Sequence, residues 1–334
     1  MKKYKLLILL LAFTMLMTGC AVYSKGAPKS KDGKIVLRAG VTTERGGNYV
    51  TGLEKFKELV EERSKGDIEI QIYPSSQLGN ERDLVEGVAV GTIEMCVSST
   101  GPLANFSKDF QVFDLPYICS DLERTYDFMD GEYGREILDT LTEKGIYGLG
   151  FWENGYRHIT NSKKPINTPE DVKNLKIRVM ENAVHIDSFK EWGANPTAMS
   201  WAEVFTSLQQ GTIDAQENPI VIAYTNKLWE VQDYLSLTGH FYSPATMLIN
   251  NDLLESLSDE HKKIILECEE EARHFERDFN QSLEKENLKE IADHGMAINE
   301  VDTSIWIEAS QPIYKKYENV INPKYIKALL GKGE

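Results

Sequence analysis

The sequence is short of positive charge, because 37 lysines and arginines face 52 aspartates and glutamates, for a formal net charge of −15. Nucleic-acid-binding domains gather lysine and arginine into a basic patch or stripe, and the chain shows no such stripe for nucleic acid or for a membrane surface. We therefore expect no nucleic-acid partner. An acidic protein that binds an acidic ligand must concentrate its few cations locally, which makes closely spaced arginines informative.

The chain also lacks the common catalytic motifs. G-x-S-x-G, H-E-x-x-H, the P-loop and G-x-G-x-x-G are absent, so nucleophilic, zinc and nucleotide chemistry have no usual signature here. Glu181 and His185 are spaced as an acid and base on one helix, but polar cleft or surface residues are the simpler interpretation. Glu270 and His274 are likewise poor candidates for metal ligands. We expect no cofactor, no metal and no enzymatic activity.

Cysteine is scarce, with four copies and no C-x-x-C pair or metal-like spacing to histidine. Cys96, Cys119 and Cys268 lie far apart in the sequence. Buried thiols are the default expectation for these three residues, and one disulfide remains open.

A long apolar run is present at the amino end, but it is too short to span a membrane. Lysines at three of the first five residues precede apolar residues 6–16, and a threonine-glycine pair precedes Cys20. A spanning helix needs about 20 apolar residues, whereas this pattern is typical of a secretion signal. We predict a lipoprotein signal peptide over residues 1–19 with lipidation of Cys20; simple cleavage without lipidation is the alternative.

Residues 20–34 are polar and rich in Lys, Ser, Gly and Pro, without apolar periodicity. This composition predicts a flexible tether. A lipid anchor plus a tether would hold the folded part outside the cell membrane, at its outer face or in the periplasm.

From residue 35 the pattern alternates between strands and helices. We expect strands over 35–41, 68–73 and 93–97, with helices over 52–64 and 81–90. A polar loop over residues 42–48 follows the first strand, and a polar turn over 98–101 follows the third. This alternation predicts an α/β fold with a mostly parallel sheet covered by helices on both faces.

The carboxyl-terminal part is predicted to be helical. Ser258 caps a run over residues 259–294 that contains neither Gly nor Pro. At 1.5 Å per residue this run measures ~54 Å, longer than one small lobe, so it should lie across two lobes. One more strand over 296–301 and closing helices over 305–329 complete the chain.

A short repeat supports a two-lobed architecture. Residues 84–95 contain G-T-I-E and residues 204–215 contain G-T-I-D, and the two glycines, Gly91 and Gly211, are 120 residues apart. Two copies of a common helix-to-strand turn explain this equally well. If the repeat is real, Ser98 corresponds to Asn218, and two similar lobes face each other across a cleft.

The most informative stretch runs from residue 152 to residue 219 and centres on Arg178. Apolar and cationic residues alternate over residues 175–179, so a strand would place Arg178 on its polar side. Arginine suits carboxylate binding because its guanidinium is planar, always charged and offers a fixed fork of donors. A solvated arginine on a surface strand is the alternative for this motif taken alone.

The motifs around Arg178 favour a ligand site. Arg157 stands among aromatic and amide side chains, and Thr168-Pro169-Glu170-Asp171 predicts a short capped helix. Ser200 to Glu203 reads as a capping box that opens a helix ending at Gly211, and a strand leads from there into residues 216–219. The resulting order is strand, short helix, strand, helix, strand, with polar groups at junctions where open α/β sheets bind ligands.

Two continuous runs carry a family resemblance: W-E-N-G-Y-R-H-I-T-N-S-K-K-P-I-x-T-P-E-D-V-K-N-L-K-I-R-V-M and G-A-N-P-T-A-M-S-W-A-E-V-F-x-S-L-Q-Q-G-T-I-D-A-Q-E-N-P. They resemble the extracytoplasmic solute-binding proteins of TRAP transporters, the DctP-type family. The resemblance covers roughly residues 35–330. It implies a two-lobed, type II periplasmic-binding-protein fold with a long helix spanning both lobes. It also implies a small-molecule organic acid and a membrane permease as partners, with the receptor acting as a monomer.

By the same resemblance, lobe I comprises residues 35–154 plus about 244–283, and lobe II comprises residues 155–243 plus about 284–330. The hinges then lie near Asn154 and near residues 240–244.

The resemblance assigns the ligand carboxylate to Arg178, the arginine of L-K-I-R-V. Arg157, Trp201 and Asn218 are its expected neighbours in the cleft. The further candidate ligand contacts are Glu181, Asn182, His185, Thr42, Glu44 and Ser99.

The ligand is expected to be a monocarboxylate sugar acid, such as a hexuronate or an aldonate. A carboxylate in the cleft, which we assign to Glu181, repels a second anionic end but accepts hydroxyl protons. A C4-dicarboxylate is the alternative if Glu181 and Asn182 face solvent and Arg45 or His185 serves a far carboxylate. A sensory binding protein and an envelope enzyme acting on sugar acids are the alternatives from other functional classes.

Overall fold

The computed structural model describes residues 27–332, so the predicted signal peptide and Cys20 lie outside the described residues. The end of the predicted tether is described, and it turns back onto the first strand. Lys29 forms an antiparallel bridge with Ile35, and the backbone N–H of Val36 donates to the carbonyl of Pro28 at 2.9 Å. This end of the tether is therefore attached to the sheet.

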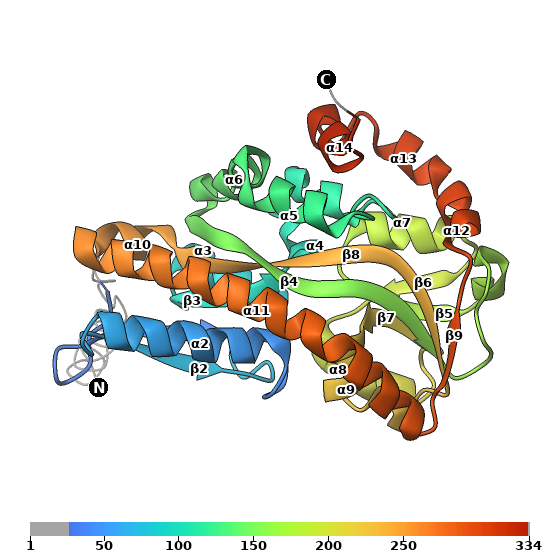
Figure 1. Ribbon diagram of the computed structural model, residues 1–334, viewed down its shortest axis with the longest axis horizontal. Helices are drawn as coiled ribbons and strands as arrows, with labels where there is room; N and C mark the ends of the chain where they lie inside the picture. Colours follow the sequence, from blue (N-terminus) through green and yellow to red (C-terminus); the bar gives the residue numbers. More distant parts are fainter. Residues whose placement is uncertain (1–26, 333–334) are drawn as a thin grey trace, which may run out of the picture.

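One mixed sheet of nine strands runs through the molecule (Figure 1). Its order is β2-β1-β3-β8-β4-β7-β5-β6, with β9 beside β8. The strands are β1 (Ile35–Gly40), β2 (Ile68–Tyr73), β3 (Met95–Ser99), β4 (Ile146–Asn161), β5 (Lys176–Val179), β6 (Asn195–Ala198), β7 (Ala215–Pro219), β8 (Tyr234–Asn250) and β9 (Ala297–Glu300). The prediction of parallel strands is confirmed at both ends of the sheet and is wrong in its centre. There β4 and β8 pair antiparallel with each other, β4 pairs antiparallel with β7, and β8 pairs antiparallel with β3.

Helices cover both faces of the sheet. They are α2 (Asn48–Arg63), α3 (Glu81–Val90), α4 (Thr100–Leu103), η1 (Lys108–Asp114), α5 (Leu122–Asp130), α6 (Glu132–Asp139), η2 (Thr142–Lys144), η3 (Pro169–Val172), α7 (Ala183–Glu191), α8 (Trp201–Gln209), α9 (Ile220–Thr225), η4 (Leu228–Glu230), α10 (Asn251–Ser256), α11 (Asp259–Asp293), α12 (Thr303–Ala309), α13 (Gln311–Tyr317) and α14 (Pro323–Leu329). Phe151 and Trp152 are neighbours in β4, yet they belong to two different core clusters. Successive strand residues point to opposite faces, so each face has its own core.

Local capping signals explain several helix starts. Asn80 accepts a hydrogen bond from the backbone N–H of Asp83 at the start of α3, and the Asp83 carboxylate accepts one in return. The predicted capping box at Thr168 also forms, although the helix it opens is a 3₁₀ helix. The capping box predicted at Ser200 does not form, because the Ser200 hydroxyl donates to the Glu203 carboxylate and receives no backbone hydrogen bond.

The long helix predicted for the carboxyl-terminal part is confirmed. α11 has 35 residues and is thus ~52 Å long. It packs against α2 and β4 at one end of the molecule and against α9 at the other, and Figure 1 shows it running across both halves. The predicted last strand and closing helices correspond to β9 and to α12, α13 and α14.

β4 and β8 are the two longest strands of the sheet, and they pair along most of their length. The pairing of β4 with β8 shifts register between Glu153 and Gly155, and Gly155 has a φ of +118°, in a region that glycine adopts far more readily than other residues. This irregularity coincides with the hinge predicted near Asn154. The division into lobes by residue range stays a prediction.

Cys96, Cys119 and Cys268 are buried free thiols, so the disulfide left open by the sequence does not form among the described residues. Within residues 27–332, no helix combines the length and apolar character needed to cross a membrane.

Candidate functional site

A cavity of about 30 Å³ lies between the two lobes, near the carboxyl ends of β1, β3, β5 and β7. Ligands of open α/β sheets bind at this edge. The lining residues come from both halves of the chain: Thr42, Thr43, Tyr49, Glu81, Ser99, Asn154, Arg157, Arg178, Met180, Trp201, Asn218 and Ile222. We call this space the inner cavity.

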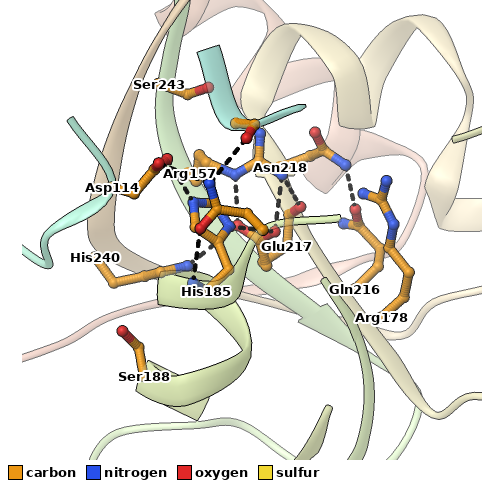
Figure 2. Close-up of polar contacts among 12 residues, drawn as sticks. Asp114, Arg157, Arg178, His185, Ser188, Gln216, Glu217, Asn218, His240 and Ser243 are labelled. Atoms are coloured by element: carbon orange, nitrogen blue, oxygen red, sulfur yellow. Dashed lines mark hydrogen bonds and ion pairs between the residues drawn. The ribbon is translucent and has the colours of Figure 1, made fainter. Parts of the chain in front are cut away.

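Arg178 lies on β5 and is 5% exposed. Its Nε donates to the carbonyl of Met199 at 2.9 Å, and its Cζ lies 5.7 Å from the centre of the Trp201 ring. Within residues 27–332, Arg178 has no ion pair and its two terminal nitrogens make no hydrogen bond; Figure 2 draws no interaction to this guanidinium. Two donors of a buried cation therefore remain available for a ligand.

The charge of Arg178 survives its burial. Burial lowers the pKa of Arg178 to about 10, Glu217 raises it, the Arg157 cation lowers it further and Glu81 raises it. The guanidinium is thus protonated at neutral pH, and an incoming carboxylate would compensate a desolvated positive charge.

Arg157 is buried but already paired. Its Nη2 lies 2.8 Å from Oε1 of Glu217 and also donates to the Glu217 carbonyl at 2.6 Å. Burial alone would raise the pKa of Glu217, but Arg157, His185 and His240 hold that pKa well below its usual range. Arg157 therefore lines the inner cavity beside Arg178, as the sequence predicted, but as half of an ion pair.

A buried polar network holds Glu217 from the side opposite Arg157 (Figure 2). His240 Nε2 lies 3.3 Å from Oε2 of Glu217, and His185 Nδ1 lies 3.8 Å from Oε1. His185 Nε2 contacts Oδ1 of Asp114 at 3.1 Å. These contacts fix the position of the Glu217 carboxylate and, through it, that of Arg157.

Three buried side chains around the inner cavity carry polar atoms without a hydrogen-bond partner. They are Thr43 through Oγ1, Tyr49 through its hydroxyl and Asn154 through Oδ1. Burial, with Glu81 and Glu276 adding to it, raises the pKa of Tyr49 well above its usual range, so Tyr49 keeps its proton. Because an unsatisfied buried polar group costs about 1–3 kcal/mol, a ligand that bonds to these atoms is favoured.

Glu81 places a carboxylate in the same cavity as Arg178. Its Oε1 accepts hydrogen bonds from the backbone N–H of Ser99 at 2.7 Å and from the Ser99 hydroxyl at 2.8 Å. Burial raises the pKa of Glu81, while Ser99, Arg178 and Arg157 act in the opposite direction. The cavity therefore has a cation on the β5 side and an acidic group on the α3 side.

The structure brings six of the predicted residues together around the inner cavity, namely Thr42, Ser99, Arg157, Arg178, Trp201 and Asn218. Glu44 lines an adjoining outer cavity. Asn218 donates through Nδ2 to Oε1 of Gln216 at 2.7 Å.

Three predicted residues do not line either cavity: Glu181, Asn182 and His185. Asn182 caps α7 and donates to Asp114 at 2.7 Å, so its side chain is already bonded to other protein groups. His185, one helical turn later, is held in the Asp114–Glu217 network. The acidic group assigned to Glu181 is supplied by Glu81.

The sequence interpretation missed Thr43, Tyr49, Glu81, Asn154, Met180 and Ile222 as lining residues. The short repeat contained a signal for Glu81. Glu81 and Trp201 are the first residues of α3 and α8 and stand 120 positions apart, which is the offset of the repeat. Glu81 is therefore the counterpart of Trp201, which was predicted. The structure extends that repeat, since a strand and then a helix follow in both copies. No comparable local signal marks Tyr49 or Ile222.

Comparison with known proteins identifies the family. A family model described as "Bacterial extracellular solute-binding protein, family 7" matches residues 39–320. The 2,3-diketo-L-gulonate-binding periplasmic protein YiaO of Escherichia coli K12 is 36% identical over 265 residues, covering 79% of this chain and 80% of that protein.

Solved structures agree with this match and carry different ligands. A TRAP solute-binding protein of Polaromonas sp. JS666, bound to D-erythronate, has 37% identity and a TM-score of 0.87, covering 90% of this chain and 99% of that one. The galactonate-bound sugar acid binding protein DctPAm of Advenella mimigardefordensis has 31% identity and a TM-score of 0.87, covering 90% and 97%. A succinate-bound protein of Sulfurospirillum deleyianum has 27% identity and a TM-score of 0.85, covering 89% and 99%.

Proposed function

The chain belongs to family 7 of the bacterial extracellular solute-binding proteins, and the solved relatives described above are TRAP receptors and not enzymes. We therefore propose that the protein captures a sugar acid and delivers it to a membrane permease. The ligand would be a monocarboxylate such as a hexuronate or an aldonate. Its carboxylate would pair with Arg178, while its hydroxyls would bond to the neutral polar groups of the inner cavity.

The observation that carries this proposal is the state of the Arg178 guanidinium. It is buried and positively charged, and within the described residues it has no acidic partner in ion-pair distance. Leaving a buried charge uncompensated is costly, so a bound anion stabilises the site. A carboxylate matches the guanidinium fork with two parallel hydrogen bonds.

Glu81 is the reason for preferring a sugar acid over a C4-dicarboxylate. Among the residues that line the inner cavity the cations are Arg157 and Arg178, and Arg157 is held by Glu217. A second carboxylate of the ligand would therefore face Glu81 without a free cation. Hydroxyl groups can instead donate to Glu81 and bond to Tyr49 and Asn154.

The extracytoplasmic location agrees with the family, and we also propose that Cys20 is lipidated after removal of residues 1–19. Radiolabelled palmitate should then be incorporated by cells expressing the native chain and not by cells expressing Cys20→Ser. Equal labelling of both would overturn the lipid anchor and leave the receptor proposal intact.

Isothermal titration calorimetry tests the ligand class. The panel is glucuronate, galacturonate, gluconate, malate and succinate. At least one sugar acid should bind with a stoichiometry of one, and mass spectrometry of the recovered ligand should show it unchanged. Tight binding of succinate with no heat from the sugar acids would reverse the assignment, and a converted ligand would favour the envelope enzyme. A sensory role predicts binding without permease-dependent uptake in whole cells.

A further inference from the structure

A second and much larger space adjoins the inner cavity. The outer cavity measures about 750 Å³ and shares Thr42 and Trp201 with the inner one. Its remaining walls come from the loops after β1 and β2 and from α8, α9 and the segment up to η4: Glu44, Arg45, Pro74, Ser75, Ser76, Gln77, Ala202, Phe205, Thr225, Asn226, Lys227 and Glu230.

The volumes of the two cavities decide where a ligand body fits. About 10–15 Å³ of such cavity volume holds one water molecule, so the inner cavity of about 30 Å³ accommodates only a few atoms of a ligand. Ligand pockets for small molecules typically measure about 300–1,000 Å³, and the outer cavity of about 750 Å³ lies within this range. A carboxylate at Arg178 must therefore be followed by atoms that extend along Trp201 into the outer cavity.

The outer cavity has an aromatic wall suited to a sugar ring. Trp201 and Phe205 stand four residues apart on α8, so they lie on the same face of that helix. Both side chains are half-buried. Flat aromatic surfaces pack against apolar C–H faces, and the indole of Trp201 extends this surface from the cation–π contact with Arg178 into the outer cavity.

The charged groups of the outer cavity balance one another. Glu44 and Arg45 stand on the lobe I side, and Lys227 and Glu230 stand on the lobe II side. Two acids and two bases give this space no formal net charge, so its overall field does not favour an anionic sugar unit over a neutral one. Charged donors and acceptors around a cavity do bond well to neutral hydroxyl groups.

The backbone at the rim has an unusual conformation. Ser75, Ser76 and Lys227 have φ values of 54°, 57° and 50°, in the left-handed region that non-glycine residues seldom adopt. All three line the outer cavity. Such conformations cluster at ligand-contacting segments, where the surrounding structure holds them in place.

From these observations, and resting on the proposed capture of a sugar acid, we propose that the outer cavity is a distal subsite for a second, uncharged sugar unit. The ligand class would then be an aldobiouronic acid, in which a uronate anchored at Arg178 is linked glycosidically to one neutral sugar. That neutral sugar would pack on Trp201 and Phe205 and bond to the charged groups at the rim.

Calorimetry with matched ligands tests the subsite. Free glucuronate and galacturonate are compared with aldobiouronic acids of several linkages, using the native chain. At least one disaccharide acid should bind about tenfold or more tightly than its free uronate. If every disaccharide acid binds no tighter than the free uronate, the subsite is refuted.

The variant Phe205→Ala separates a ligand subsite from a lobe-closing contact. It should remove most of the preference for the disaccharide acid, and it should weaken the free uronate much less than the disaccharide acid. Phe275→Ala, on α11 and outside both cavities, is the matched control and should change neither affinity. Equal weakening of both ligands by Phe205→Ala would show a role in closure and overturn the subsite.

The variant Arg178→Ala distinguishes this inference from the proposed function. If Arg178→Ala binds neither the free uronate nor the disaccharide acid, and the native chain binds both with equal affinity, the distal subsite alone is overturned. Undiminished binding of both ligands in Arg178→Ala would overturn the carboxylate anchor on which the subsite rests.

Discussion

Arg157 and Glu217 form a fully buried ion pair at the wall of the inner cavity, with 1% and 0% of their side chains exposed. The pair holds one arginine in place and leaves Arg178 as the guanidinium with free terminal donors among the described lining residues. The site thus separates an arginine held by protein groups from one that we propose binds the ligand.

Removing Glu217 should destabilise the whole protein. Glu217→Ala leaves Arg157 buried without its partner, which costs about 3–5 kcal/mol. Urea unfolding should therefore show a much lower midpoint for Glu217→Ala. The control is Glu86→Ala, which breaks an exposed pair with Arg82 and should cost about 1 kcal/mol or less; similar losses in both variants would contradict the role of burial.

Arg178 should affect ligand binding far more than stability. A lost charge-assisted pair costs about 2–5 kcal/mol, so Arg178→Ala should weaken sugar acid binding by tens to thousands of fold. Arg178→Lys should recover a part of this, because an ammonium lacks the two-point fork. Calorimetry measures both variants, with exposed Arg82→Ala as the control. Native affinity in Arg178→Ala would refute the anchor.

Glu81 should exclude a second carboxylate, and this exclusion should depend on pH. Gluconate and glucarate share a carbon chain and differ in the far end, which is a hydroxyl in gluconate and a carboxylate in glucarate. The pKa of Glu81 is raised, so acidification through that pKa neutralises Glu81 and removes its repulsion of glucarate.

The affinity ratio of gluconate to glucarate should therefore fall as the pH is lowered. Glu81→Gln should lower the ratio about tenfold at neutral pH and weaken its pH dependence. Competition calorimetry between pH 5 and pH 8 gives the ratio directly. A ratio that is the same in Glu81→Gln and in the native chain would show that Glu81 does not select the ligand.

Lobe closure should accompany binding. The inner cavity is lined from both halves of the chain, and the register of β4 shifts between Glu153 and Gly155, near the predicted hinge. A ligand that contacts both lobes favours the closed form, since it binds that form more tightly. Small-angle X-ray scattering should show a smaller radius of gyration at saturation. An unchanged radius with bound ligand would argue for a rigid receptor.

His158 should make the protein sensitive to acid. Its Nδ1 accepts a hydrogen bond from the backbone N–H of Gly239 at 3.0 Å, and burial lowers its pKa to about 3, with His240 adding to this shift. The folded pKa is depressed below the unfolded value of about 6.5, so the unfolded state binds one more proton between these values.

The free energy of unfolding should therefore fall by about 1.4 kcal/mol per pH unit through His158 as the pH drops below about 6. Urea unfolding of His158→Gln should show a slope shallower by one proton. His274→Gln changes an exposed histidine on α11 and should leave the slope unaltered. Parallel slopes for His158→Gln and the native chain would exclude His158 as the cause.

The sequence by itself determined the elements whose signals are local. The predicted bounds of β2 and α3 match the structure residue for residue, because strand alternation and the Asn80 cap act within a few positions. The long helix and the strand that carries Arg178 were predicted for the same reason. The family followed from continuous motifs, and the same motifs predicted Arg178 as the ligand anchor.

The tertiary structure decided which distant residues meet. Glu81 lies in one cavity with Arg178, and Glu217 pairs with Arg157, through strand pairings that no local pattern encodes. His185 looked like a cleft residue in the sequence, but packing of α7 places it against Asp114. Burial and charge pairing depend on the whole fold, so Arg178 without an ion pair, Arg157 paired with Glu217, and Glu81 in the same cavity became distinguishable only in three dimensions.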